Sequence, residues 1–232
     1  SESPAIDLII GDVMGKGINA ALLGAGVKTA WHQSLVTALE EGWWAGIPPA
    51  HTIIQNLHER VVPELMAVES FITLCYARVN YDDQLLEYVH CGHTEIIYWN
   101  ELEKKCVLLH GTSPPLGMLE TERYESTAIP FRSGDCFVFF SDGVTETENN
   151  NGEQFGIERL RSVIARYNRN SPEEILDLLQ REVGLFSNST ENADDLSCLV
   201  LKAIPVSSED RVENELPVWL SNPEKRPHGR RE

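Results

Sequence analysis

The sequence predicts an α+β fold in which β-sheets are covered by layers of helices. Two helix patterns follow a short first strand, strand patterns fill the middle of the chain, and two further helix patterns precede a last strand. The chain has 232 residues, of which 42% are hydrophobic and 24% are charged. That length and composition are sufficient to bury a sizeable core.

The first strand and two helices are expected within the first 66 residues. An apolar run at 5–10 ends at a Gly-Asp pair, which is typical of a strand that runs into a loop. Apolar residues at helical spacing predict a helix over 19–40, although Gly24 and Gly26 each weaken it by about 1 kcal/mol. A Gly-Ile-Pro-Pro break precedes a second helix over 49–66.

Strand patterns dominate the middle of the chain. They predict an antiparallel meander and three later strands, at 71–79, 85–91, 95–99, 106–109, 124–129 and 136–140. The last of these reads Cys-Phe-Val-Phe-Phe and is apolar on both faces, so we expect it in the centre of a sheet.

The end of the chain divides into a folded part and a tail. Helices are predicted over 156–166 and 172–186, followed by a strand over 196–203. Residues 205–232 are charged, aperiodic and contain four of the 12 prolines, which is typical of a linker or tail. We therefore expect one domain over 1–204 and a tail over 205–232.

Charge and cysteine usage limit the function and the compartment. With 36 acidic and 19 basic residues, the formal net charge is −17, which opposes binding to nucleic acid or to an anionic membrane. The sequence contains no apolar stretch of membrane-spanning length, and its start lacks the features of a signal peptide. Five scattered cysteines without a C-x-x-C pair indicate reduced, structural thiols, so we expect a cytoplasmic protein without membrane insertion.

Three aspartates lie at the ends of predicted strands. Asp12 and Asp142 each follow an apolar strand, and Asp194 precedes the last one. If these strands are neighbours, three carboxylates meet in one cleft and supply the oxygen ligands that Mg²⁺ or Mn²⁺ requires. Each aspartate alone also fits a turn or a solvated loop.

Five short motifs in order give the sequence a family resemblance. They are Gly-Asp-Val-Met-Gly-Lys-Gly at 11–17, Cys-Gly-His at 91–93, Pro-Leu-Gly at 115–117, Ser-Asp-Gly-Val-Thr-Glu at 141–146 and Asp-Asp-Leu-Ser at 194–197. Together they resemble the metal-dependent protein phosphatases of type 2C, and more narrowly the bacterial SpoIIE-type branch. This resemblance covers about residues 5–204 and implies a four-layer α-β-β-α sandwich of two mainly antiparallel sheets.

The resemblance also implies a metal site with two Mn²⁺ or Mg²⁺ ions. Asp12 would bridge both ions, Val13 would contribute its backbone carbonyl, and Asp142 and Asp194 would each bind metal. A water between the ions would attack phosphorus, so that no side-chain nucleophile is needed. Gly15 and Gly17 are expected to let the motif turn tightly.

The chain departs from the family pattern in two places. A further acidic motif, G-G-D-x-x-D, normally lies just upstream, which indicates either a chain truncated at its N-terminus or a degenerate site. Met14 stands where animal enzymes carry a histidine proposed as general acid, and Lys16 is a weak substitute. We expect His93 to shape a hairpin and Arg78 to be a solvated surface residue.

The sequence therefore predicts an Mn²⁺- or Mg²⁺-dependent serine/threonine phosphoprotein phosphatase. The resemblance implies a phosphorylated regulatory protein as substrate, of the anti-anti-sigma (STAS) type, in bacterial signalling. Two alternatives remain open: an impaired phosphatase-like module that binds or senses a partner, and a two-metal phosphodiesterase or nuclease, which the net charge opposes.

Overall fold

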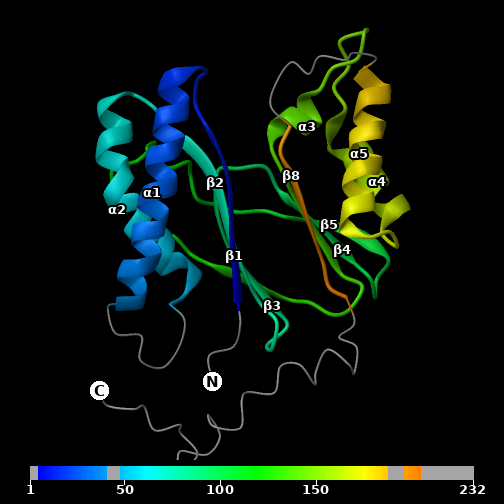
Figure 1. The fold of residues 1–232 in the computed structure, drawn as a ribbon, viewed down its shortest axis with the longest axis horizontal. Coiled ribbons are helices and arrows are strands. Elements are labelled where there is room, and N and C mark those ends of the chain that lie inside the picture. The colour runs from blue at the N-terminus through cyan, green and yellow to red at the C-terminus, as the bar shows by residue number, and fades with distance from the viewer. Residues whose placement is uncertain (1–4, 41–47, 188–195, 205–232) are drawn as a thin grey trace, which may run out of the picture.

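The computed structural model describes residues 5–40, 48–187 and 196–204, which form two facing sheets between two layers of helices (Figure 1). The first sheet has the strand order β1-β2-β3-β6, and all its neighbours are antiparallel. Its strands are Ala5–Val13 (β1), Ile72–Asn80 (β2), Leu85–Cys91 (β3) and Thr127–Pro130 (β6).

The second sheet has the order β5-β4-β7-β8 and is also antiparallel. Its strands are Ile96–Asn100 (β4), Lys105–Leu109 (β5), Cys136–Phe140 (β7) and Cys198–Lys202 (β8). Strand β7 lies between β4 and β8 and is buried along its whole length, which confirms the central strand expected from its doubly apolar sequence.

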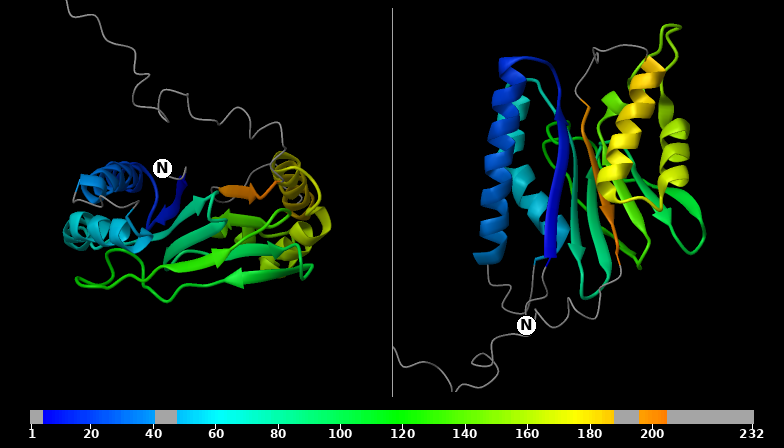
Figure 2. Two further views of the ribbon diagram at one scale, coloured as in Figure 1. Left: turned by 90° about the horizontal axis from the view of Figure 1, so that it is seen from below. Right: turned by 45° about the vertical axis from the view of Figure 1, so that its right-hand side comes forward.

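Helices cover the outer face of each sheet (Figure 2). On the first sheet lie α1 and α2, and on the second α3, α4 and α5; their bounds are Ile18–Glu40, Ala50–Ala67, Asp142–Glu146, Gly156–Tyr167 and Pro172–Ser187. The predicted four-layer α-β-β-α sandwich is thereby confirmed. No described helix is long and apolar enough to cross a membrane.

The alternation of side chains along the strands divides the interior into three cores. In β2, Leu74 and Tyr76 pack beneath α1 and α2, while Cys75 and Ala77 face the second sheet. In β7, Val138 packs beneath α4 and α5, while its neighbours face the first sheet. Each sheet therefore buries both faces, and the two sheets share a central core.

The structure corrects several predicted boundaries. Strand β1 continues beyond residue 10 to Val13, because Gly11 and Asp12 pair with Leu74 and Thr73 of β2. The strand expected over 124–129 is only the four-residue β6. Residues 142–146, for which no helix was predicted, form the short helix α3.

Some expectations fall outside the described residues. The predicted tail over 205–232 and the break before the second helix, apart from its two prolines, belong to this group. The aspartate at 194 also belongs to this group.

Candidate metal centre

Asp12 is the second-to-last residue of β1 and lies on the face of the strand that is directed toward the second sheet. It lies directly opposite Thr73 in the antiparallel register, and paired residues project from the same face. Leu8 and Ile10, at the same parity as Asp12, pack into the core between the sheets. The period-two pattern of the strand therefore directs the carboxylate to the side of the second sheet, where Asp12 remains exposed.

Gly11 allows β1 to approach β2 at this point. A Cβ atom at Gly11 would lie 2.7 Å from the backbone carbonyl oxygen of Thr73, which is closer than real contacts allow. Glycine is thus required by the neighbouring strand rather than by its own backbone angles. Its position fixes Asp12 against the second strand.

The loop after β1 turns sharply into α1. Gly15 has φ 101° and Gly17 has φ 81°, values in the left-handed region that favours glycine. The amide of Met14 donates to the Phe71 carbonyl (3.0 Å), and the amide of Ala21 donates to the Gly17 carbonyl (3.1 Å). The tight turn expected at these glycines is confirmed.

Val13 is the last residue of β1, and its side chain packs against the core while the glycine-rich loop begins after it. Its parity in β1 directs the side chain toward α1, and its Cγ2 lies 3.5 Å from the position that a Cβ at Gly24 would take. The residue also lines the pocket described below. The side chain is therefore used for packing, and the backbone carbonyl is the group that Val13 can offer to a cation.

Asp142 begins α3 directly after the buried strand β7. The amide of Ser141 donates to the Ser197 carbonyl (2.9 Å), and the Ser197 amide donates to Oγ of Ser141 (3.0 Å). These two hydrogen bonds join the end of β7 to the segment that leads into β8. The Asp142 side chain remains exposed at the start of the helix.

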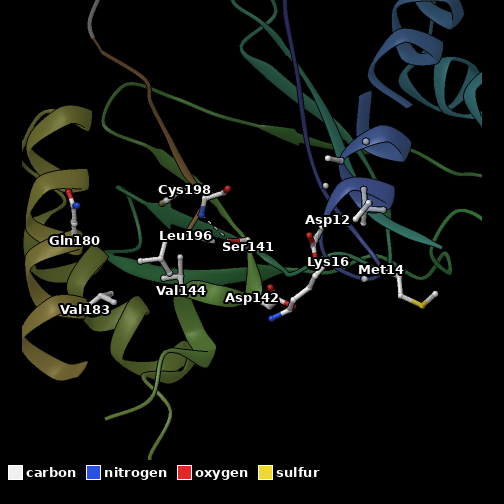
Figure 3. Close-up of a pocket in the computed structure, with 18 of the residues that line it drawn as sticks. Asp12, Met14, Lys16, Ser141, Asp142, Val144, Gln180, Val183, Leu196 and Cys198 are labelled. Atoms are coloured by element: carbon white, nitrogen blue, oxygen red, sulfur yellow. Dashed lines mark hydrogen bonds between the residues drawn. The ribbon is translucent and has the colours of Figure 1, made fainter. Parts of the chain in front are cut away.

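Asp12 and Asp142 line one open pocket of about 1170 Å³, although Asp12 lies in β1 of the first sheet and Asp142 follows β7 of the second (Figure 3). The walls are the glycine-rich loop, the start of α1, one face of α5 and the segment before β8. Asp194 lies outside the described residues, but Leu196 and Ser197, two and three positions later, line the same pocket.

The donors of this pocket suit a hard divalent cation. Asp12 and Asp142 supply carboxylate oxygens, and the loop supplies backbone carbonyls. Within residues 5–40, 48–187 and 196–204, no group of three His, Cys, Asp or Glu side chains is arranged to hold a metal. The described part therefore provides an incomplete set of oxygen ligands, which is chemically matched to Mg²⁺ or Mn²⁺.

Lys16 and Met14 differ in their direction within the loop. In Figure 3 the Lys16 side chain extends toward Asp142, whereas Met14 points away from both aspartates. Lys16 is the single cationic side chain among the described residues that line the pocket. It can therefore contribute positive charge at the site, while Met14 has no group that transfers a proton.

His93 lies closer to the site than a purely hairpin role requires. Its Nδ1 is 3.0 Å from Oγ1 of Thr73, the residue opposite Asp12. Burial lowers the pKa of His93 to about 4, as does the neighbouring His90, and the negative charge of Asp142 partly opposes this. The Cys-Gly-His motif drew attention to His93, but the motif alone does not predict a contact with Thr73, which lies 20 residues earlier.

Arg78 is buried, so the expectation of a solvated surface arginine is wrong. Its guanidinium forms two bonds with the Asp7 carboxylate (2.6 and 2.8 Å) and also donates to the Pro48 carbonyl and the Tyr76 hydroxyl. A guanidinium held in this way anchors the start of β1. It is not available to bind a phosphate.

The architecture is that of the PP2C phosphatase domains. The SiaA-PP2C domain of Pseudomonas aeruginosa superposes with a TM-score of 0.71 at 16% identity, covering 85% of this chain and 79% of that one. The PP2C phosphatase domain of SpoIIE from Bacillus subtilis, solved with a fragment of its regulatory domain, gives 0.66 at 18% identity, covering 85% and 54%. At these identities the likeness establishes the fold.

Sequence comparison gives the family. The family model of Stage II sporulation protein E (SpoIIE) matches residues 3–204, and this chain belongs to that family. Phosphoserine phosphatase RsbU of Bacillus subtilis (strain 168) is 33% identical over 151 residues, or 65% of this chain and 42% of RsbU. Phosphoserine phosphatase RsbP of the same organism is 26% identical over 139 residues, or 60% of this chain and 33% of RsbP. The chain spans less than half of either relative.

Proposed function

We propose that this chain is a metal-dependent protein phosphatase that hydrolyses phosphoserine or phosphothreonine in a regulatory protein of a bacterial signalling pathway. The observation that carries the proposal is that Asp12, in the first sheet, and Asp142, at the helix start that follows the second sheet's β7, line one open pocket. Membership of the SpoIIE family and the similarity to two phosphoserine phosphatases support the same activity.

The cation site would be built from four residues. Asp12 would bridge two ions, Val13 would offer its carbonyl oxygen, and Asp142 and Asp194 would each bind one ion. Bound Mn²⁺ or Mg²⁺ would acidify a water molecule and neutralise the charge of the phosphoryl oxygens. The glycine-rich loop would keep its backbone close to the cations, because Gly15 and Gly17 adopt left-handed conformations.

The Cys198 thiol and the Ser141 hydroxyl at the pocket wall are both poorly suited to act as nucleophiles. Burial raises the pKa of the Cys198 thiol to about 12, so it is protonated at neutral pH. Oγ of Ser141 accepts a hydrogen bond from the Ser197 amide and has a structural task. The remaining polar groups on the wall include Asp12, Asp142 and Lys16, which fit cation and phosphate binding.

The substrate would be a phosphorylated protein of the anti-anti-sigma (STAS) type. RsbU and RsbP are both named phosphoserine phosphatases, and an open pocket accommodates a phosphorylated side chain that projects from a protein surface. The net charge of −17 is unfavourable for a polyanionic substrate such as DNA. At the pocket itself, Lys16 and the bound cations would reverse the sign of the field.

The test is phosphate release from a phosphoserine peptide and from a phosphorylated STAS-domain protein by the full chain, with Mn²⁺, with Mg²⁺ and with excess EDTA. We expect turnover with either metal and none in EDTA. Turnover that persists after verified metal removal would contradict the mechanism. Binding of the phosphoprotein without any phosphate release would instead support the alternative of a binding or sensing module.

A further inference from the structure

The turn between β3 and β4 contacts both sheets at the end where the pocket lies. On one side, Nδ1 of His93 pairs with Oγ1 of Thr73 in β2 (3.0 Å). On the other side, Oγ1 of Thr94 donates a hydrogen bond to the Phe140 carbonyl at the end of β7. Two successive residues therefore connect the first sheet to the second.

Both contacts are adjacent to a candidate ligand. Thr73 is the partner of Asp12 in the β1–β2 register. Phe140 is the last residue of β7, two positions before Asp142. The connection through the turn thus spans the separation between the two carboxylates, a distance to which a cation site is sensitive.

The backbone of the turn has little freedom to move. Gly92 has φ 66° and forms a bridge with Leu74 of β2. A Cβ at Gly92 would lie 2.5 Å from two ring carbons of Pro115, so the loop that carries this proline packs directly against the turn. The His93 ring is therefore held from both its backbone and its Nδ1 atom.

The other ring nitrogen of His93, Nε2, is buried and forms no hydrogen bond of normal geometry within the described part of the chain. The Phe140 backbone lies close enough to the ring to raise the pKa of His93, against the larger effect of burial. A buried polar atom without a partner is unfavourable, and a phenylalanine would fill the space without that cost. A histidine that only shaped the hairpin would not need this nitrogen. Asp142 is near enough for its charge to influence the ring.

We propose that His93 is a positioning residue of the cation site, held by Thr73 and acting with Thr94 to fix Asp142 relative to Asp12. It touches neither substrate nor the reacting atoms, and it acts through the aspartates. Outer residues that orient the carboxylates of a metal site commonly change its affinity by about 10- to 100-fold. The inference rests on the proposed function, because it assumes that the two aspartates bind a cation.

The test is the affinity of the full chain for Mn²⁺, measured by calorimetry, together with thermal unfolding with and without Mn²⁺. His93→Phe removes both ring nitrogens at similar size, and Thr73→Val removes only the hydroxyl. Thr73→Ser restores the hydroxyl. His58→Phe is the matched control, since His58 is a buried histidine of α2 that bonds Tyr124 and the Glu120 carbonyl.

We expect His93→Phe and Thr73→Val to weaken Mn²⁺ binding at least about tenfold and to reduce the rise in melting temperature that Mn²⁺ produces. Thr73→Ser should recover most of the affinity. His58→Phe should lower the melting temperature yet bind Mn²⁺ like the wild type. If His93→Phe fails to fold, the two Thr73 variants carry the comparison.

Unchanged Mn²⁺ affinity in both His93→Phe and Thr73→Val would overturn the inference, and so would a Thr73→Ser variant as weak as Thr73→Val. Phosphate release by the wild type is measured in parallel. A chain that binds Mn²⁺ without hydrolysing phosphoserine would contradict the proposed function. The inference about His93 would still be decided by the Mn²⁺ affinities of the variants. A wild type that binds no Mn²⁺ would overturn both.

Discussion

Ser141 and Ser197 exchange two hydrogen bonds, one from each backbone amide, at 2.9 and 3.0 Å. Ser141 immediately precedes Asp142, and Ser197 lies in the segment that leads from residue 194 into β8. The pair therefore joins two parts of the chain that each carry a proposed ligand. The two serines are 56 residues apart in sequence, so they meet only when the sheet has folded.

Replacing Ser141 by alanine should loosen this junction. The substitution removes the Oγ acceptor and leaves the Ser197 amide unpaired, which we expect to lower the free energy of unfolding by about 1–3 kcal/mol. Mn²⁺ affinity should fall as well, because Asp142 follows directly. Urea unfolding and metal calorimetry measure both effects. Ser162→Ala, whose hydroxyl bonds only within α4, is the control and should change neither.

Replacing Asp142 by asparagine should abolish activity without unfolding the chain. The amide keeps the shape but removes the charge that holds a cation, so turnover of a phosphoserine peptide should fall well beyond the ~100-fold typical of outer residues. The exposed position of the side chain predicts an unchanged melting temperature in EDTA. Glu146→Gln, at the other end of α3, should retain activity; full activity in Asp142→Asn would contradict the assignment.

Gly11 and Gly26 should respond in opposite ways to alanine. At Gly11 the new Cβ meets the Thr73 carbonyl at 2.7 Å, so we expect a loss of about 1–3 kcal/mol in stability. At Gly26, within α1, nothing lies within 4 Å of the new Cβ, and alanine should stabilise the helix by about 0.5–1 kcal/mol. Thermal unfolding of the two variants decides this, and a tolerated Gly11→Ala would refute the close approach.

The buried Arg78 should be essential for stability. Arg78→Met leaves the Asp7 carboxylate and the Pro48 carbonyl without their donor, and breaking a buried pair in this way costs about 3–5 kcal/mol. The loss should be independent of Mn²⁺, because the pair lies at the opposite end of β1 from Asp12. Arg123→Met, at an exposed position, is the control. Equal denaturation midpoints for the two variants would contradict the prediction.

Stability should decrease as the pH falls below about 6.5. Burial lowers the pKa of His93 to about 4, and burial also lowers the pKa of His90. The unfolded chain then binds more protons than the folded chain between pH 6.5 and 4, so acid favours unfolding. Denaturation of wild type and His93→Phe in EDTA across this range measures the effect. The variant should show the shallower pH dependence, and identical slopes would contradict the prediction.

Sequence patterns predicted the parts of the fold that depend on local alternation. The doubly apolar run at 136–140 indicated a central strand, and β7 is one. The pattern did not extend the first strand beyond residue 10, because Gly11 and Asp12 are poor strand formers. Their pairing with Leu74 and Thr73 depends on contacts more than 60 residues away.

In the candidate site, too, local sequence predicted some residues, whereas the roles of others depend on contacts between distant parts of the chain. Motif order indicated Asp12 and Asp142, and the structure places both in one pocket, while Asp194 remains a prediction. The role of His93 could not be read from its own neighbours. Thr73 lies 20 residues before it, and nothing in either local sequence indicates a hydrogen bond between them. The burial of Arg78 could not be predicted from its neighbours in the sequence, because its partner Asp7 is 71 residues away.

The division of the site between two sheets has a mechanical consequence. Asp12 belongs to one half of the sandwich and Asp142 to the other, and the shared core between them includes the stacked rings of Tyr98 and Phe137. A cation bound by both carboxylates would act as a clamp, since at 100 times its dissociation constant it adds about 2.7 kcal/mol against unfolding. Amide hydrogens in the facing strands β2 and β7 should then exchange more slowly with solvent, far beyond the reach of the ion itself.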